Sequence, residues 1–215
     1  MKPFLLFDFD GTIADSLHLG WKIANIIAPH FGHDAFSEEE FEHFRSLPIT
    51  RILKELHVPL YKLPLAIKMA LSEYRHLVHE LEPCKGVIGM LEQLKNMQIP
   101  MALLSSNTGE NLSLFLKRMQ IDAFEWVEGT SGILRKQHRI KQQIKKHKLD
   151  PKQVIYVGDE TRDIDAAKKC GLKVIAVTWG FHTVEYLSSH NPDFLVHHPD
   201  EIVEIVKQYS SAILV

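Results

Sequence analysis

FLLFDFDGT, residues 4–12, joins a continuous apolar run to two closely spaced carboxylates. An apolar run of this length is typical of a strand that is buried on both faces of a parallel sheet. Asp8 and Asp10 follow at its carboxyl end, the edge where open α/β sheets bind ligands. In extended geometry they share a face, and two such anions resist ionisation unless a cation lies between them. A strand that ends in an ordinary Asp-Gly turn is the alternative.

The composition of the 215-residue chain is that of an ordinary globular protein, with 45% hydrophobic and 24% charged residues. A formal net charge of −2 gives no strong field that would attract nucleic acid or an acidic membrane. Cys84 and Cys170 make no disulfide framework and are typical of a reducing compartment. No apolar stretch reaches the ~20 residues that span a bilayer. We therefore expect a cytoplasmic monomer that binds neither nucleic acid nor membrane.

Residues 17–82 carry a helical pattern with no convincing strand. We expect a capping box at Ser37 and a further helix cap at Thr50. Pro64 suits the first turn of a long helix. A helical insert of this length is well beyond an ordinary loop.

Beyond Gly86, apolar runs alternate with amphipathic helices, which predicts a doubly wound parallel sheet with right-handed crossovers. A turn is expected at Ser131-Gly132. The further strands are expected at residues 100–104, 124–127, 154–157, 174–177 and 194–196. The helices are expected at residues 87–96, 110–119, 140–147, 166–170 and 202–206.

Ser105, Ser106 and Asn107 follow the second of these strands and precede a helix. The free backbone N–H groups of a helix N-terminus bind oxyanions, and neighbouring hydroxyls suit such a site. The same residue types are also good N-caps, so a structural role is the alternative.

GDETRD, residues 158–163, puts a second group of carboxylates at the end of the fourth strand. Hard oxygen ligands without a nearby His–Cys pattern favour Mg²⁺ over zinc. Taken alone, the Gly-Asp pair would be an ordinary turn.

In this order, the motifs resemble those of the haloacid dehalogenase superfamily of phosphohydrolases. FDFDGT resembles the first motif, ALLSSN the second, the segment at Lys136 the third and GDETRD the fourth. The resemblance implies a Rossmann-like core of residues 1–15 and 84–215. A small all-helical cap domain, residues 16–83, is inserted after the first strand and moves on hinges near Ala14–Ser16 and Glu82–Lys85. The first strand should lie between the second-motif and fourth-motif strands.

The resemblance also implies roles for residues. Asp8 is expected to attack phosphorus as the nucleophile, and Asp10 to act as general acid and base. Ser105 is expected to bind phosphate, with Ser106 as the register alternative and Asn107 in support.

The third-motif lysine is assigned to Lys136, with Lys141 as the fallback, because the segment is rich in basic residues. This lysine is expected to bind phosphate and to moderate the repulsion between the paired carboxylates. The expected Mg²⁺ ligands are Asp8, the backbone carbonyl of Asp10, and Asp159, with Asp163 steadying the metal.

Arg45 and Arg51 of the helical insert are candidates for binding the non-phosphate end of a substrate, because guanidinium recognises carboxylate or phosphate bidentately. Solvated helix ends explain both equally simply. VTWGF and the later PDFLV resemble the end of phosphoglycolate-phosphatase-like members. Trp179 and His182, in and after VTWGF, are expected to be structural or rim residues.

The expected reaction is Mg²⁺-dependent hydrolysis of a small phosphorylated metabolite through an aspartyl-phosphate, and the resemblance suggests phosphoglycolate. A phosphomutase could use the same four motifs and is the alternative. A haloacid dehalogenase is disfavoured by Asp10 and by Asp159 with Asp163, because that branch lacks the second aspartate and needs no metal. A non-enzymatic binding module would not need this full set of residues.

Overall fold

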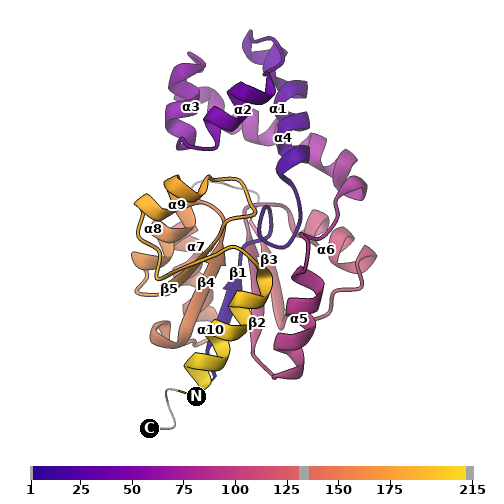
Figure 1. The fold of residues 1–215 in the computed structure, drawn as a ribbon. Helices are drawn as coiled ribbons and strands as arrows, with labels where there is room; N and C mark the ends of the chain where they lie inside the picture. Colours follow the sequence, from indigo (N-terminus) through magenta and orange to yellow (C-terminus); the bar gives the residue numbers. More distant parts are fainter. Residues whose placement is uncertain (1, 131–135, 212–215) are drawn as a thin grey trace.

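The computed structural model of the protein describes residues 2–130 and 136–211 and confirms the doubly wound α/β fold (Figure 1). Six parallel strands form one sheet in the order β3-β2-β1-β4-β5-β6. As predicted, β1 is central, since Leu5 pairs with Met101 of β2 and with Ile155 of β4. The strands are β1 (Phe4–Phe7), β2 (Met101–Ser105), β3 (Trp126–Gly129), β4 (Val154–Gly158), β5 (Lys173–Val177) and β6 (Phe194–Val196).

Helices cover both faces of the sheet. Because side chains alternate along β1, the strand contributes to a separate hydrophobic cluster on each face. Leu5 and Phe7 pack in one cluster with apolar residues of α5 (Val87–Asn96), α6 (Gly109–Arg118) and α10 (Pro199–Ser211). Phe4 and Leu6 pack in a second cluster with α7 (Lys136–Lys146), α8 (Thr161–Lys168) and α9 (Val184–Ser189). All four β1 residues are buried, which explains why the strand is a continuous apolar run.

A separate helical group lies beyond the carboxyl ends of the strands (Figure 1). The predicted capping box at Ser37 and the first-turn position of Pro64 are confirmed. The predicted cap at Thr50 is wrong, because Pro48 is extended and the helix already begins at Ile49. The helices of this group, which we call the cap, are α1 (Leu17–Ile27), α2 (Glu38–Phe44), α3 (Ile49–Glu55) and α4 (Leu63–Leu77), with short 3₁₀ turns at Ala28–Phe31, Leu60–Lys62 and Val78–Glu80.

Several predicted boundaries in the core are wrong, including those of α10 (Pro199–Ser211), which extends beyond the expected residues 202–206 at both ends. Pairing with β2 begins at Trp126, so β3 starts two residues later than expected. α7 begins at Lys136 and α8 at Thr161, both earlier than expected, because motif residues themselves form the first turns. The turn expected at Ser131-Gly132 lies outside the described residues.

The chain leaves the core for the cap and returns to it at adjacent positions. Ala14 and Pro83 form an isolated antiparallel bridge. The Asp15 N–H donates to the Glu82 carbonyl at 2.9 Å, and the Cys84 N–H donates to the Ile13 carbonyl at 2.9 Å. These contacts coincide with the predicted hinge segments; the domain boundaries and the hinge motion stay predictions.

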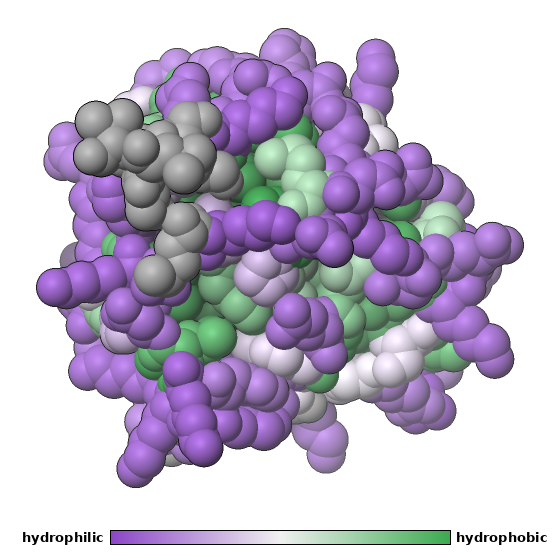
Figure 2. All heavy atoms as spheres, turned by 90° about the horizontal axis from the view of Figure 1, so that it is seen from below, coloured by the Kyte–Doolittle hydropathy of each residue, from purple (hydrophilic) through white to green (hydrophobic). Residues whose placement is uncertain are grey.

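The end of the molecule away from the cap is viewed in Figure 2, where hydrophilic residues surround smaller hydrophobic areas. Within residues 2–130 and 136–211, no helix combines the length and the hydropathy that a membrane crossing requires. The cytoplasmic location and the monomeric state stay predictions.

Candidate active site

Three neighbouring strands bring the sequence motifs to one edge of the sheet. Phe7 of β1 pairs with Leu103 of β2 and with Val157 of β4. The residues that follow each strand therefore meet at the same edge, which is where ligands bind in doubly wound sheets. Asp8, the serines after β2 and the carboxylates after β4 all lie there.

Asp8 is held by a buried lysine. The Lys136 ammonium donates to Asp8 Oδ2 at 2.5 Å and also forms an ion pair with Asp163 Oδ1. Burial alone lowers the pKa of Lys136, but the charges of Asp163 and Asp8 outweigh burial and raise that pKa well above its ordinary value. The lysine is therefore cationic. Lys141, the alternative from sequence, is exposed.

Asp10 is held by one residue from the cap and one from the core. The Tyr74 hydroxyl of α4 donates to Asp10 Oδ1 at 2.7 Å, and the Asn107 side-chain amide donates to Oδ2 at 3.2 Å. Burial raises the pKa of Asp10 to about 6, although the hydrogen bond from Tyr74 opposes the shift. Burial and the charge of Asp10 raise the pKa of Tyr74 well above 10, so the phenol keeps its proton. A carboxyl group with a pKa near 6 suits general acid–base chemistry.

Asp159 lies under the loop that follows β5. Its Oδ1 accepts from the Thr12 hydroxyl at 3.1 Å, and its Oδ2 accepts from the Phe181 N–H at 2.7 Å. A Cβ at Gly11 or Gly180 would come within 2.1 or 2.2 Å of the Asp159 side chain, so only glycine fits at these two positions. Burial, then the charges of nearby carboxylates, raise the pKa of Asp159 well above its usual value.

Three buried carboxylates fit a hard divalent cation. Asp8, Asp159 and Asp163 each offer an oxygen, and these three atoms lie within 4.8 Å of one another. The raised pKa values of Asp8 and Asp159 indicate that buried negative charge is incompletely offset by protein cations. An all-oxygen donor set of this kind is typical of Mg²⁺. The Asp10 carboxylate is instead bonded to Tyr74 and Asn107, and metal binding by its backbone carbonyl stays a prediction.

Ser105 and Ser106 have different surroundings. Ser105 ends β2, is 2% exposed, and its hydroxyl accepts from the Asn107 N–H at 3.0 Å. Ser106 lines a cavity together with Asp10. Asn107 is fixed from the other side, since its Oδ1 accepts from the side-chain amide of Asn111 at 2.8 Å. Ser106 thus lines the cavity and Ser105 is buried at the end of β2, and which of the two binds phosphate stays a prediction.

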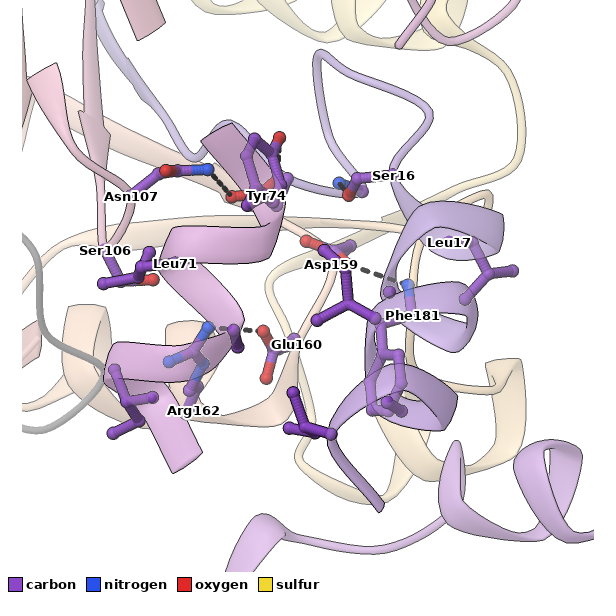
Figure 3. A pocket seen from close by; sticks show the side chains of 18 residues that line it. Ser16, Leu17, Leu71, Tyr74, Ser106, Asn107, Asp159, Glu160, Arg162 and Phe181 are labelled. Atoms are coloured by element: carbon purple, nitrogen blue, oxygen red, sulfur yellow. Dashed lines mark hydrogen bonds and ion pairs between the residues drawn. The ribbon is translucent and has the colours of Figure 1, made fainter. Parts of the chain in front are cut away.

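This cavity, of about 300 Å³, lies between the sheet edge and the cap (Figure 3). From the core, Asp10, Ser106, Asn107, Asp159, Glu160, Arg162 and Phe181 line it. Arg162 is paired with Glu160 at 2.5 Å. From the cap, residues of α1 and α4 line it, including Leu17, Leu71 and Tyr74 (Figure 3).

Comparisons with known proteins agree with this geometry. Residues 5–177 match the family model of the haloacid dehalogenase-like hydrolases. The chain belongs to this family. A phosphoglycolate phosphatase from Synechococcus elongatus is 33% identical over 205 residues, which cover 95% of this chain and 97% of that protein.

Two further relatives extend the comparison. Pyrophosphatase PpaX from Bacillus velezensis is 23% identical over 209 residues, 94% of either chain. A crystal structure described as a "predicted phosphatase" from Clostridium acetobutylicum has a TM-score of 0.83 at 20% identity, and the match covers 97% of this chain and 99% of that one. The structural likeness supports the haloacid dehalogenase-like fold.

The two cap arginines do not line the cavity of this haloacid dehalogenase-like hydrolase. The Arg45 guanidinium donates to the carbonyls of Phe181 at 2.7 Å and Gly180 at 3.1 Å, and it pairs with Glu42. Arg45 therefore ties the cap to the loop after β5. The Arg51 side chain is 55% exposed and pairs with Glu55 on its own helix. Neither guanidinium lines the cavity in this structure, and a contact of either with substrate stays a prediction.

Trp179 and His182 have structural partners in this hydrolase, as expected from sequence. The Trp179 indole donates to the Thr12 carbonyl at 3.2 Å. His182 Nδ1 accepts from the Thr161 N–H at 2.9 Å, and burial lowers the pKa of His182. Both side chains hold the loop after β5 against neighbouring motifs.

Sequence reasoning missed two residues of the hydrolase site. Tyr74 lies in the long helix expected after Pro64, and helical periodicity carries no information about where a phenol hydroxyl will point. Arg162 lies within GDETRD, where the carboxylates carry the expected metal chemistry and the arginine was given no role. Nothing in the sequence alone indicates that either side chain lines the cavity.

Proposed function

We propose that the protein is a Mg²⁺-dependent phosphomonoester hydrolase that acts through an aspartyl-phosphate on Asp8. The observation that carries the proposal is the pairing of two carboxyls with different environments. Asp8 is bound to the Lys136 ammonium at 2.5 Å, whereas Asp10 accepts from the neutral hydroxyl of Tyr74 and the side-chain amide of Asn107. Burial raises the pKa of both carboxyls, that of Asp10 to about 6. Such a difference in partners suits one carboxyl for attack and the other for proton transfer.

In the first step, the Asp8 carboxylate attacks phosphorus and the bond from phosphorus to the ester oxygen breaks. Asp10 gives its proton to that oxygen, and the alcohol leaves. In the second step, Asp10 takes a proton from water, and the resulting hydroxide attacks the phosphorus of the aspartyl-phosphate. Inorganic phosphate leaves, and Asp8 is regenerated as a carboxylate.

The other residues of the edge stabilise the phosphoryl group. The Lys136 ammonium and the Ser106 hydroxyl are suited to contact its oxygens, which become more strongly bound as charge develops. Mg²⁺ bound by Asp8, Asp159 and Asp163 would supply further positive charge beside the phosphoryl group. Tyr74 and Asn107 position the Asp10 carboxyl through their hydrogen bonds.

The substrate is proposed to be a small phosphorylated metabolite. The name of the Synechococcus relative suggests phosphoglycolate, and the name of the Bacillus relative suggests a diphosphate. A phosphomutase remains the second candidate, because it could use the same edge. Release of inorganic phosphate without a sugar-bisphosphate activator would argue for hydrolysis.

The proposal is tested with a generic artificial phosphate ester, assayed in Mg²⁺ and in chelator. We expect hydrolysis in Mg²⁺ and its loss in chelator. Asp8→Asn should lower turnover by at least ~10⁴-fold, because the nucleophile is removed. Mass spectrometry of the quenched wild-type enzyme should find one added phosphoryl group, absent from Asp8→Asn. Full activity in chelator would contradict the Mg²⁺ dependence. Near-normal turnover by Asp8→Asn would contradict the role of Asp8 as nucleophile.

A further inference from the structure

The side of the active-site cavity formed by the cap is apolar. Ile23 and Ile27 of α1 face it together with Ile67 and Leu71 of α4. Among residues 16–83, all of which the structure describes, no lysine, arginine or histidine lines this cavity. The polar group contributed by α4 is the Tyr74 hydroxyl, which is already bonded to Asp10.

A second cavity, of about 260 Å³, lies inside the cap among all four of its helices. Its walls are formed mainly by aromatic and aliphatic side chains, including Phe41, Phe44, Ile52 and Leu63, with His33 as the titratable residue among them. Apolar cavities of even ~150 Å³ that are lined by such residues bind benzene rather than water. The size and the lining of this second cavity therefore suit a hydrocarbon group.

The two cavities share part of their walls. Gly20, Ala24 and Ile27 of α1, together with Phe181, line both. Gly20 is exposed, and a Cβ there would meet no atom within 4 Å, so the space beside this glycine is open. Glycine in a helix interior weakens the helix relative to alanine. Gly20 and Ala24, one turn apart, place no side chain larger than a methyl group on this shared wall.

An anionic leaving group fits this surface poorly. Arg162 is the cation that lines the first cavity within the described residues, and it is already paired with Glu160. A carboxylate or a second phosphate that pointed toward the cap would lose its hydration without gaining a partner there. The cap of this chain therefore disfavours both phosphoglycolate and diphosphates.

We propose that the preferred substrate is the phosphate monoester of an apolar alcohol, an inference that rests on the proposed hydrolase function. The phosphate lies at Asp8, and the hydrocarbon part passes Gly20 into the second cavity. The substrate class is defined by its hydrophobic leaving group.

The first experiment measures kcat/KM for a series of linear alkyl phosphates of increasing length, with phosphoglycolate beside them. Each methylene that enters the cavity should raise kcat/KM by about 3- to 4-fold until the cavity is full, the scale of burying a CH₂ group. Phosphoglycolate should be a poorer substrate than hexyl phosphate. A flat series, or a clear preference for phosphoglycolate, would overturn the inference while leaving the hydrolase proposal standing.

The second experiment narrows the passage. In Gly20→Leu, kcat/KM should no longer rise with the alkyl chain length of the substrate. In Gly20→Ala, most of that rise should remain. Gly89→Leu is the matched control, because Gly89 is an exposed helical glycine of α5 with no atom within 4 Å of an added Cβ. That variant should keep the wild-type series. An equal loss in Gly20→Leu and Gly89→Leu would refute the passage.

Binding separates the two proposals. Calorimetry with alkyl phosphonates, which cannot be hydrolysed, should give affinities that rise with chain length in the wild type and are flat in Gly20→Leu. Length-dependent binding without any turnover would support the apolar site and contradict the hydrolase. Turnover together with binding that does not depend on chain length would support the hydrolase and contradict the apolar site.

Discussion

The sheet edge and the cap enclose one cavity by different interactions. At the edge, each carboxylate has directional partners: Lys136 binds Asp8, Asn107 binds Asp10, and a backbone N–H binds Asp159. On the cap side the contact surface is mostly hydrocarbon, with Ser16 and Tyr74 as the polar exceptions. Directional bonds fix atoms at a point, whereas apolar surface selects for shape and hydrophobicity. The reaction and the choice of substrate can therefore change independently, because different forces govern them.

Among substitutions that test this comparison, the largest effect is expected where the two regions meet, at Asp10. Asp10→Asn should lower kcat by ~10²–10⁴, the usual scale for a lost general acid–base, with Mg²⁺ dependence largely retained. Tyr74→Phe removes the hydrogen bond from the cap and keeps the carboxyl, so its loss should be smaller. A Tyr74→Phe loss as large as that of Asp10→Asn would mean that the phenol itself transfers the proton.

The same substitution should affect stability with a defined sign. Because burial raises the pKa of Asp10 from 3.8 to about 6, the folded state binds more protons than the unfolded state between these values. The free energy of unfolding therefore falls as pH rises through this window. Asn does not ionise, so the Asp10→Asn variant lacks this decrease. Its free energy of unfolding minus that of the wild type should therefore rise by about 1–2 kcal/mol between roughly pH 5 and pH 7.5. Urea unfolding in chelator measures this, and a pH-independent difference would contradict it.

An intermediate effect is expected at the serines after β2. Ser106→Ala should lower kcat/KM by about 10- to 100-fold, the scale of one lost hydrogen bond to a charged group. Ser105→Ala removes an acceptor for the Asn107 N–H and should act mainly on stability. If Ser105→Ala lost more activity than Ser106→Ala, the phosphate contact would belong to Ser105.

The smallest effect is expected at the cap arginines, which test the polar link between the two regions. Arg45→Ala removes two charged hydrogen bonds to the carbonyls of Gly180 and Phe181, and should lower the free energy of unfolding by about 1–3 kcal/mol. Arg51→Ala removes an exposed pair within one helix and should change it by less than about 0.5 kcal/mol. Denaturant unfolding of both variants measures the difference. Equal values would mean that the loop after β5 is held without Arg45.

The sheet edge could be predicted from sequence because its residues come directly after buried strands. The topology of a parallel sheet then brings Asp8 and Asp159 together, although 150 residues separate them in the chain. The choice between Ser105 and Ser106 is harder to make from sequence: successive strand residues point to opposite sides, so an error of one position reverses the direction of a side chain.

The cap residues that line the cavities could not be predicted from sequence, because helical packing rather than motif spacing decides which side chains lie there. Arg45 and Arg51 have the chemistry of substrate-binding residues, but one is bonded to backbone carbonyls and the other is on the surface. Conversely, Gly20 has no side chain whose chemistry could indicate a function from sequence. Its proposed role depends on the open space beside it, which only the structure shows.

The junction of the cap with the core has a consequence for how such a protein can evolve. The bridge between Ala14 and Pro83 holds the two ends of the insert side by side. The insert is therefore attached to the core as a closed loop. Lengthening a closed loop adds little conformational entropy cost, so inserts of other sizes could be grafted at the same junction. A descendant could thus acquire a new specificity through exchange of one contiguous piece of gene. The sheet edge, inherited unchanged, would continue to carry the reaction.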